Sequence, residues 1–236
     1  TSFGNSVSGG VDYVERDAKV YAQGTTNTID WGVKRMGANK VWGVSTGRGV
    51  KVAVIDSGIE KTHPDLVANL KGGVNCVTGS GCSNDQWDDG VGHGTEVAGL
   101  IAAENNDIGY VGVAPEADLY AVRVLDNTGS GSASDMISGI YWAADNGMQI
   151  ANISLGWHLN PSTDANLIAE ETTALNYACG KGMVTVASSG NSGSGPDCNK
   201  VMYPAKISST VIAVGSILPD NTIAPFSCHG PEVEFV

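Results

Sequence analysis

Asp56 and His93 are the two residues of this sequence whose type and setting suit acid–base chemistry. Asp56 ends the apolar run VAVID, which is typical of a fully buried strand, and His93 lies between glycines in GVGHGT, where a helix is predicted to begin. A carboxylate that accepts the Nδ1 proton of an imidazole leaves Nε2 free as a general base for a serine hydroxyl. A lone Asp and a lone His are more often turn or cap residues, so the chemistry depends on elements that bring them together.

The elements that would do this alternate between short apolar runs and helical patterns. Strands are expected at 50–56, 118–125, 148–156, 183–190 and 209–218, and helices at 94–104, 134–147 and 167–182. The first of these helices is expected to bury Val97, Leu100 and Ile101. The alternation predicts an α/β fold with a mostly parallel central sheet and helices on both faces. Ligands of such sheets bind at the carboxyl ends of the strands, where Asp56, the SLG segment and the SSGN segment should meet.

The composition limits the classes of partner. Thirteen Lys and Arg residues against 25 Asp and Glu residues give a net charge of −12, with no basic block, so no nucleic-acid partner is expected. No run approaches the length of about 18 apolar residues that a membrane span needs, so no membrane partner is expected. The 236 residues, 42% of them hydrophobic, suit one large domain or two small ones.

The five cysteines have no Cys-x-x-Cys zinc spacing. Cys76 with Cys82, and Cys179 with Cys198, are close enough in sequence to form disulfides, which would indicate an oxidising compartment. The alternative is that all five cysteines, including Cys228, are buried thiols.

Six motifs of this sequence together resemble the subtilisin-like serine endopeptidases, in the order of that family and close to its spacing. The motifs are VAVIDSGIEKTHPDL, GHGTEVAG, GVAPEADLYAVRVL, NISLG, SSGN and YPAK. The resemblance implies an enzyme that hydrolyses peptide bonds through an acyl-enzyme. It implies that Asp56 orients His93, that His93 is the general base, and that the side chain of Asn191 donates to the oxyanion. The alternative for Asn191 is an ordinary Gly-Asn turn.

The nucleophilic serine of that family lies in a Gly-Thr-Ser-Met-Ala type motif, and the sequence contains no such segment. By the family's spacing the motif would follow Val236, so residues 22–236 are expected to be a peptidase domain without its C-terminal part, inactive as supplied. The GVSTG match at 43–47 precedes a strand, so Ser45 is expected to be a surface serine. The alternative function is a catalytically dead pseudoprotease that binds extended peptides.

Residues 1–21 resemble the tail of the family's inhibitory propeptide, and the resemblance places the processing bond at Tyr21–Ala22. It therefore implies a zymogen that its own propeptide inhibits. It also implies a secreted, extracellular monomer whose partners are polypeptide substrates.

The same resemblance implies how a substrate would bind. An extended peptide would pair with two backbone segments, Gly129–Gly131 (with Ser130 between them) and Ser154–Gly156 (with Leu155 between them). A side-chain pocket would be lined by the second segment together with Ser188, Ser189, Gly190 and Met202. Met202 stands where the family often has glycine, so the pocket should be shallow; a core methionine is the alternative.

The segment AENNDIGYVGV resembles the loop that holds the family's structural Ca²⁺. The implied ligands are the carbonyls of Glu104, Ile108 and Tyr110, the Asn106 amide, the Asp65 carboxylate and Gln23. A polar surface turn is the alternative for this loop. A metallohydrolase built on Asp56, His63, Asp65 and His93 is a further alternative, although its spacing matches no zinc motif. Glu96 stands where the family commonly has a second histidine, a departure that should affect local packing more than chemistry.

Overall fold

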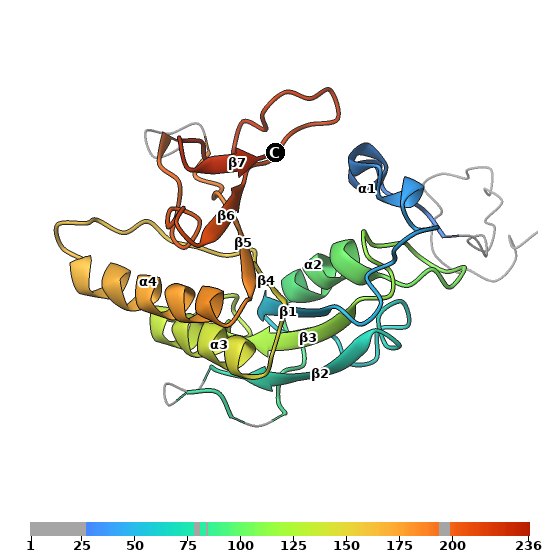
Figure 1. The fold of residues 1–236 in the computed structure, drawn as a ribbon, viewed down its shortest axis with the longest axis horizontal. Helices are drawn as coiled ribbons and strands as arrows, with labels where there is room; N and C mark the ends of the chain where they lie inside the picture. Colours follow the sequence, from blue (N-terminus) through green and yellow to red (C-terminus); the bar gives the residue numbers. More distant parts are fainter. Residues whose placement is uncertain (1–26, 78–80, 84, 194–198) are drawn as a thin grey trace, which may run out of the picture.

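The structure is a computed structural model, and it describes residues 27–77, 81–83, 85–193 and 199–236. Within these residues, seven strands form one sheet in the order β2-β3-β1-β4-β5-β6-β7, and all neighbouring strands are parallel (Figure 1). The strands are β1 (Lys51–Asp56), β2 (Leu70–Asn75), β3 (Asp118–Arg123), β4 (Ile150–Ile153), β5 (Val184–Ser188), β6 (Val211–Val214) and β7 (Val233–Phe235). The helices are α1 (Trp31–Met36), the 3₁₀ helix η1 (Ala38–Lys40), α2 (His93–Ala102), α3 (Ala133–Asp145) and α4 (Ala165–Gly180).

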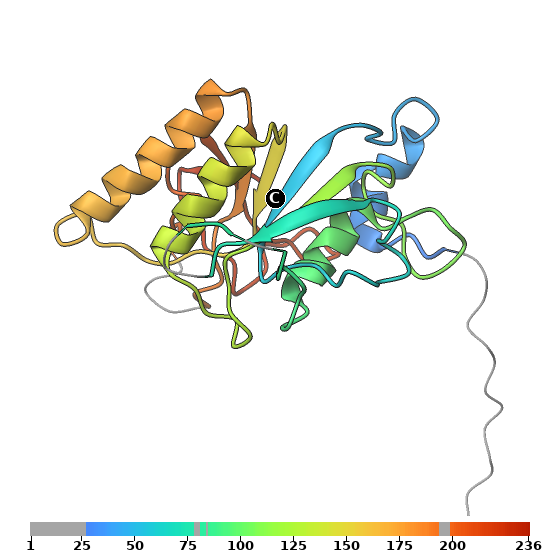
Figure 2. The ribbon, with the colours of Figure 1, turned by 90° about the horizontal axis from the view of Figure 1, so that it is seen from below.

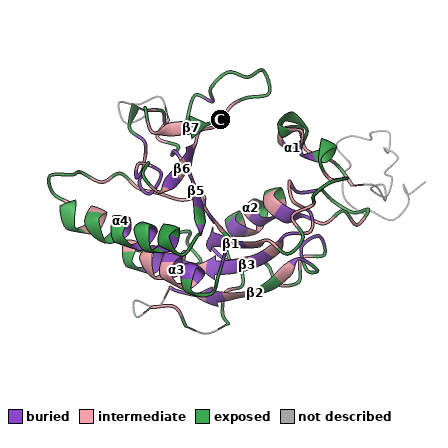
Figure 3. Ribbon diagram, viewed as in Figure 1, coloured by how far each residue is buried: buried purple, intermediate pink, exposed green. Residues whose placement is uncertain are grey.

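Helices cover both faces of the sheet, which confirms the predicted fold class. Helices α3 and α4 lie together on one face and α2 lies on the other (Figures 1 and 2). Because side chains alternate along a strand, β1 contributes to two cores. Ala53 and Ile55 pack in the core under α3 and α4, and Val52 and Val54 pack in the core under α2. Strand β1 is accordingly buried along nearly its whole length (Figure 3).

Helix α4 runs back across the sheet from its carboxyl edge and buries one stripe of residues. The stripe consists of Glu171, Ala174, Leu175 and Ala178, at helical spacing. Three of the four are apolar, as a core-facing stripe requires. Glu171 is a carboxylic acid in an apolar layer, and it is fully buried.

The buried face of α2 differs in part from the prediction. Val97 and Ile101 pack against the core, but Leu100 is 59% exposed and the fully buried positions are Gly94, Ala98 and Ala102. These small residues let the helix approach the sheet closely, whereas Leu100 points away from it. Strands β2 and β7 and helix α1 were not predicted.

The cysteine hypotheses have different outcomes. Cys76 and Cys82 form a disulfide, so the alternative of five buried thiols is wrong. Cys179 is an exposed free thiol, which disagrees with a bridge to Cys198, and Cys198 itself lies outside the described residues. The predicted propeptide tail and its junction at Tyr21–Ala22 also lie outside them. Among the described helices none has the length and apolar character to cross a bilayer.

Candidate active site

The structure brings Asp56 and His93 into direct contact. Asp56 is the last residue of β1, and His93 is the first residue of α2. The Nδ1 of His93 lies 2.7 Å from Oδ1 of Asp56, which also accepts a hydrogen bond of 2.7 Å from the backbone N–H of Ser57. The Asp56 side chain is fully buried, and its Oδ2 has no partner among the described residues. The two hydrogen bonds to Oδ1 are therefore the ones that compensate for the burial of the carboxylate.

The environment of His93 favours its protonated form. The hydrogen bond that His93 donates to Asp56 raises the pKa of His93, and partial burial lowers it. The charges of Asp56, Glu96 and Asp89 raise this pKa further, so the net direction is upward. The side chain is 48% exposed, and Nε2 has no partner within the described part of the chain. An imidazole held through Nδ1 with Nε2 open to solvent is arranged to take a proton from a group on the solvent side.

Asn191 lies at the same edge of the sheet. It follows β5, and β5 is separated from β1 only by β4, so the ends of β1 and β5 lie roughly 10 Å apart. The Asn191 side chain is exposed, and its amide has no hydrogen-bond partner among the described residues. A cavity of about 430 Å³ lies over the ends of β4, β5 and β6, lined in part by Ser154, Asn191 and the exposed Leu100 of α2.

The two segments expected to pair with a substrate flank β1. Gly129–Gly131 follow β3 and Ser154–Gly156 follow β4, and β3 and β4 are the two neighbours of β1 in the sheet. The first segment is exposed, and the turn before it is fixed by Asp126, whose carboxylate accepts the backbone N–H groups of Thr128 and Ser130. An extended peptide between the two segments would therefore cross the carboxyl end of β1, where Asp56 lies.

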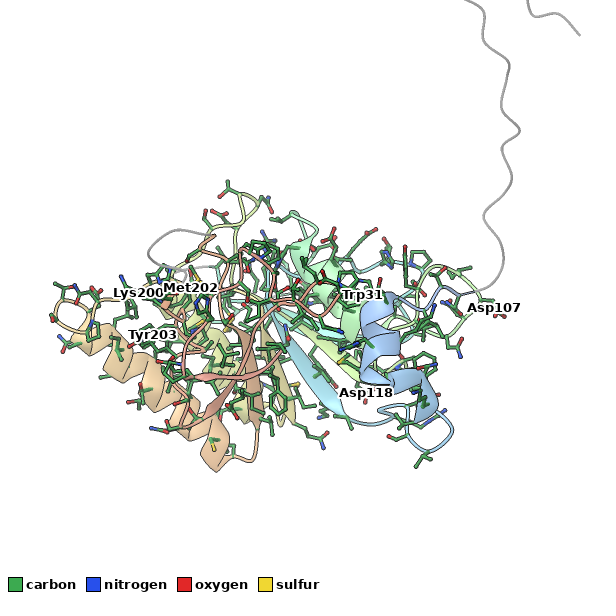
Figure 4. The ribbon with its side chains drawn as sticks, turned by 90° about the horizontal axis from the view of Figure 1, so that it is seen from above. Trp31, Asp107, Asp118, Lys200, Met202 and Tyr203 are labelled. Atoms are coloured by element: carbon green, nitrogen blue, oxygen red, sulfur yellow. A yellow bond between two sulfur atoms is a disulfide. The ribbon has the colours of Figure 1, made fainter. Side chains whose placement is uncertain are left out.

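The side chain of Met202 lies against Gly190, one of the residues expected to line the side-chain pocket. A Cβ added to Gly190 would meet the Cγ and the Sδ of Met202, each at 2.6 Å, so the methionine side chain fills the space in front of that glycine. Ser188 ends β5, and Ser189 is buried and donates a 2.7 Å hydrogen bond to the carbonyl of Cys228. Figure 4 shows Met202 beside Tyr203 on the segment that leads to β6, far from Asp107 in the loop after α2.

Comparisons with known proteins identify the family. Residues 47–236, which include Asp56, His93 and Asn191, match the Subtilase family of peptidases. The chain belongs to the subtilase family. It is 44% identical to an "Alkaline protease" of Alkalihalobacillus alcalophilus, over 96% of this chain and 54% of that protein. It is 45% identical to "Subtilisin E" of Bacillus subtilis (strain 168), over 95% of this chain and 55% of that protein. It is 46% identical to "Subtilisin Savinase" of Lederbergia lenta, over 89% of this chain and 71% of that protein.

This subtilase chain thus spans about half the length of several of the curated relatives it matches. The metallohydrolase alternative does not fit its structure, because no group of three or more His, Cys, Asp or Glu side chains in the described ranges could hold a metal ion. The Nδ1 of His63 instead accepts a 3.3 Å hydrogen bond from the backbone N–H of Asp65. Ser45 is exposed, as expected for a surface serine, and its backbone N–H donates to the carbonyl of Val41.

The loop after α2 in this subtilase gathers oxygen atoms around one point. The carbonyls of Glu104 and Tyr110 each lie 3.3 Å from the side-chain nitrogen of Asn27, and the carbonyl of Ile108 contacts the same atom. Asp65 is beside them: its Oδ2 accepts the Tyr110 N–H at 3.0 Å, and its buried Oδ1 has no partner among the described residues. Three convergent carbonyls and an unpartnered carboxylate oxygen form a donor set that suits Ca²⁺.

The other two expected ligands, Asn106 and Gln23, remain predictions. The Oδ1 of Asn106 accepts the N–H of Ile108 at 3.1 Å, and Gln23 lies outside the described residues. Asn27, which belongs to none of the motifs quoted above, lies at the centre of the described oxygen atoms. Its segment is docked by bonds from the Thr28 N–H to Gly109 and from the Val111 N–H to Thr28. Since an amide can be rotated to exchange its oxygen and nitrogen, Asn27 can offer an oxygen to a cation at this point.

Proposed function

We propose that this subtilase chain is part of a serine endopeptidase that hydrolyses peptide bonds through an acyl-enzyme. Asp56 holds the imidazole of His93 through Nδ1, and Nε2 takes the proton of a serine hydroxyl supplied by residues that follow Val236. The Asn191 amide donates to the oxyanion of the tetrahedral intermediate. Glu104, Asn106, Ile108, Tyr110, Asp65 and Asn27 form the region that would hold a structural Ca²⁺.

The observation that carries the proposal is the 2.7 Å contact between a fully buried carboxylate and an imidazole whose second nitrogen is open. Its setting supports the same chemistry. Asn191, whose amide has no hydrogen-bond partner among the described residues, lies two strands away at the same edge. The two segments expected to hold an extended peptide flank β1. The family match covers all three residues.

The activity is tested with the full-length protein, a fluorogenic peptide library and a serine-directed phosphonate. We expect cleavage of peptides, stoichiometric labelling of one serine by the phosphonate, and loss of all activity once that serine is labelled. Binding of extended peptides with no cleavage and no labelling would instead support the pseudoprotease. The chain of 236 residues is the matched control, and we expect it to bind peptides without cleaving them.

Calcium should stabilise the full-length protein. We expect EDTA to lower the free energy of unfolding by about 3 kcal/mol, if the ion is present at roughly 100 times its dissociation constant. Asp65→Asn should remove most of the difference between samples with and without calcium. Asp107→Asn is the control, since the Asp107 side chain is exposed in the same loop. Equal melting temperatures with and without calcium, in differential scanning calorimetry, would contradict the site.

We further propose that the protein is secreted, as a monomer that its own propeptide inhibits until processing. The Cys76–Cys82 disulfide supports an oxidising compartment, because such bridges are rare in reducing ones.

A further inference from the structure

The carboxylate of Asp89 is the centre of a set of hydrogen bonds beside the Asp56–His93 pair. Its Oδ1 accepts bonds of 2.9 Å from the Ser57 hydroxyl and from the backbone N–H groups of Val91 and Gly92. Its Oδ2 accepts the backbone N–H of Thr95 at 2.9 Å and the Thr95 hydroxyl at 2.6 Å. Neither the sequence motifs nor the catalytic roles proposed above include Asp89.

These bonds fix the first turn of α2. The residue before the helix is Gly92, which has no side chain to cap it, so the N–H groups of the first turn need acceptors from elsewhere. Asp89 supplies one to Thr95, and the Ser57 hydroxyl supplies another to Gly94 at 3.0 Å. The negative charge of Asp89 also lies at the positive end of the helix dipole. Because His93 is the first residue of α2, the same bonds fix the position of the backbone that carries the His93 ring.

Ser57 connects this set to the end of β1. Its backbone N–H donates to Asp56, and its hydroxyl donates to Asp89. The first turn of α2 packs directly against the chain that follows β1. A Cβ added to Gly94 would lie 2.1 Å from the carbonyl oxygen of Gly58 and 3.1 Å from Cβ of Asp56. A small shift of the first turn would therefore move the His93 ring relative to Asp56.

We propose that Asp89 is a positioning residue, which acts through Ser57 and the first turn of α2 to hold Nδ1 of His93 on the Asp56 carboxylate. The role rests on the proposed function, in which His93 is the general base. The hydrogen bonds of Asp89 go to Ser57, Val91, Gly92 and Thr95 and not to His93 itself. The contribution of Asp89 is the alignment of the base, on which proton transfer depends steeply.

Asp89 also acts on His93 through its charge. Three carboxylates face the ring: Asp56 from β1, Glu96 from α2 itself, and Asp89 from the loop before α2. Burial raises the pKa of Asp89, but the bonds from Thr95, Gly92 and Val91 outweigh it and lower the pKa overall, so Asp89 is ionised at neutral pH. Removing this charge, or loosening the hydrogen bond between His93 and Asp56, should lower the pKa of His93. A role confined to the stability of the fold would leave that pKa unchanged.

Asp89→Asn tests the proposal, because the amide keeps the shape of the side chain but replaces an acceptor by a donor facing Thr95. In the full-length protein we expect kcat/KM to fall by ~10- to 100-fold. In the 236-residue chain we expect an NMR titration of the His93 ring to give a lower pKa than in the parent. Asp88→Asn is the matched control, since Asp88 is adjacent and exposed and caps Lys61 instead.

Ser57→Ala separates position from charge and covers the case in which Asp89→Asn does not fold. It removes the link but keeps the carboxylates of Asp56, Glu96 and Asp89. We therefore expect kcat/KM to fall, and the pKa of His93 to fall less than it does in Asp89→Asn. If Asp89→Asn matches Asp88→Asn in both measurements, the proposal is wrong. If the parent full-length protein cleaves nothing, the proposed function is wrong, while the titration still decides whether Asp89 acts on His93.

Discussion

Asp56→Asn in the full-length protein will lower kcat by about four orders of magnitude, the loss that is typical when the orienting acid of a catalytic triad is made neutral. The amide cannot compensate the imidazolium that forms when His93 takes a proton, and it can hold the ring in the wrong tautomer. The measurement is kcat with a chromogenic peptide, after circular dichroism has shown a native fold. Glu60→Gln is the control, because Glu60 is an exposed carboxylate four residues along the chain.

The pH dependence gives a second readout of the same variant. The Asp56 hydrogen bond is the largest influence that raises the pKa of His93, and the base must be neutral to act. In the parent protein the acidic limb of kcat/KM should therefore lie above the ordinary histidine value, and in Asp56→Asn it should move to lower pH. An unchanged kcat, or a limb that stays in place, would exclude Asp56 as the partner of the base.

Glu171→Leu will stabilise the protein at alkaline pH by about 3 kcal/mol. Glu171 is fully buried, and neither of its carboxylate oxygens has a partner among the described residues. Burial alone raises its pKa from 4.5 to about 7, and a difference of that size corresponds to about 3 kcal/mol of unfolding free energy. Leucine fills the apolar layer with no charge to desolvate.

The sign of the effect follows from where the proton is lost. Below pH 4.5 Glu171 is protonated in both the folded and the unfolded chain, so its charge costs nothing. Between 4.5 and about 7 the unfolded chain releases the proton first, and stability falls as the pH rises; above about 7 the loss is complete. The variant should therefore gain stability over the parent across this window and keep the gain at pH 9.

Urea unfolding of the full-length protein at pH 4 and pH 9 measures this difference. Glu170→Leu is the matched control, since Glu170 precedes Glu171 and is exposed. It should change stability little, and equally at both pH values. If the parent and Glu171→Leu differ by the same amount at pH 4 and pH 9, the buried carboxylate does not titrate as its surroundings require.

The sequence predicted those parts of the fold that have a strong hydrophobic period. The run that ends at Asp56 became β1, and the helices at 134–147 and 167–182 became α3 and α4, shifted by one or two residues. Strand β2 was missed because LKGGVN has two glycines and a lysine and only one fully buried residue, Val74. A strand of that composition gives no alternating pattern.

The misses around the site have another cause. The buried face of α2 consists of small residues such as Ala98 and Ala102, because the helix lies close to the sheet. The distance between a helix and a sheet depends on the tertiary structure, so the hydrophobic pattern of the helix alone does not predict it. Asn27 and Asp89 carry no periodic signal either: each acts through contacts with residues that the chain topology brings near. Asp56 and His93 could be paired from the sequence only because their motifs resemble a known family.

The all-parallel sheet has a consequence for how the chain folds. No two neighbouring strands can be joined by a tight hairpin, and Val52 of β1 must find Leu119 on one side and Ile150 on the other. Chains dominated by such distant pairings cross a high entropic barrier and collapse well before their strands are in register. During that interval the apolar strand edges are open to other molecules, so dilution favours the native state over aggregates during refolding.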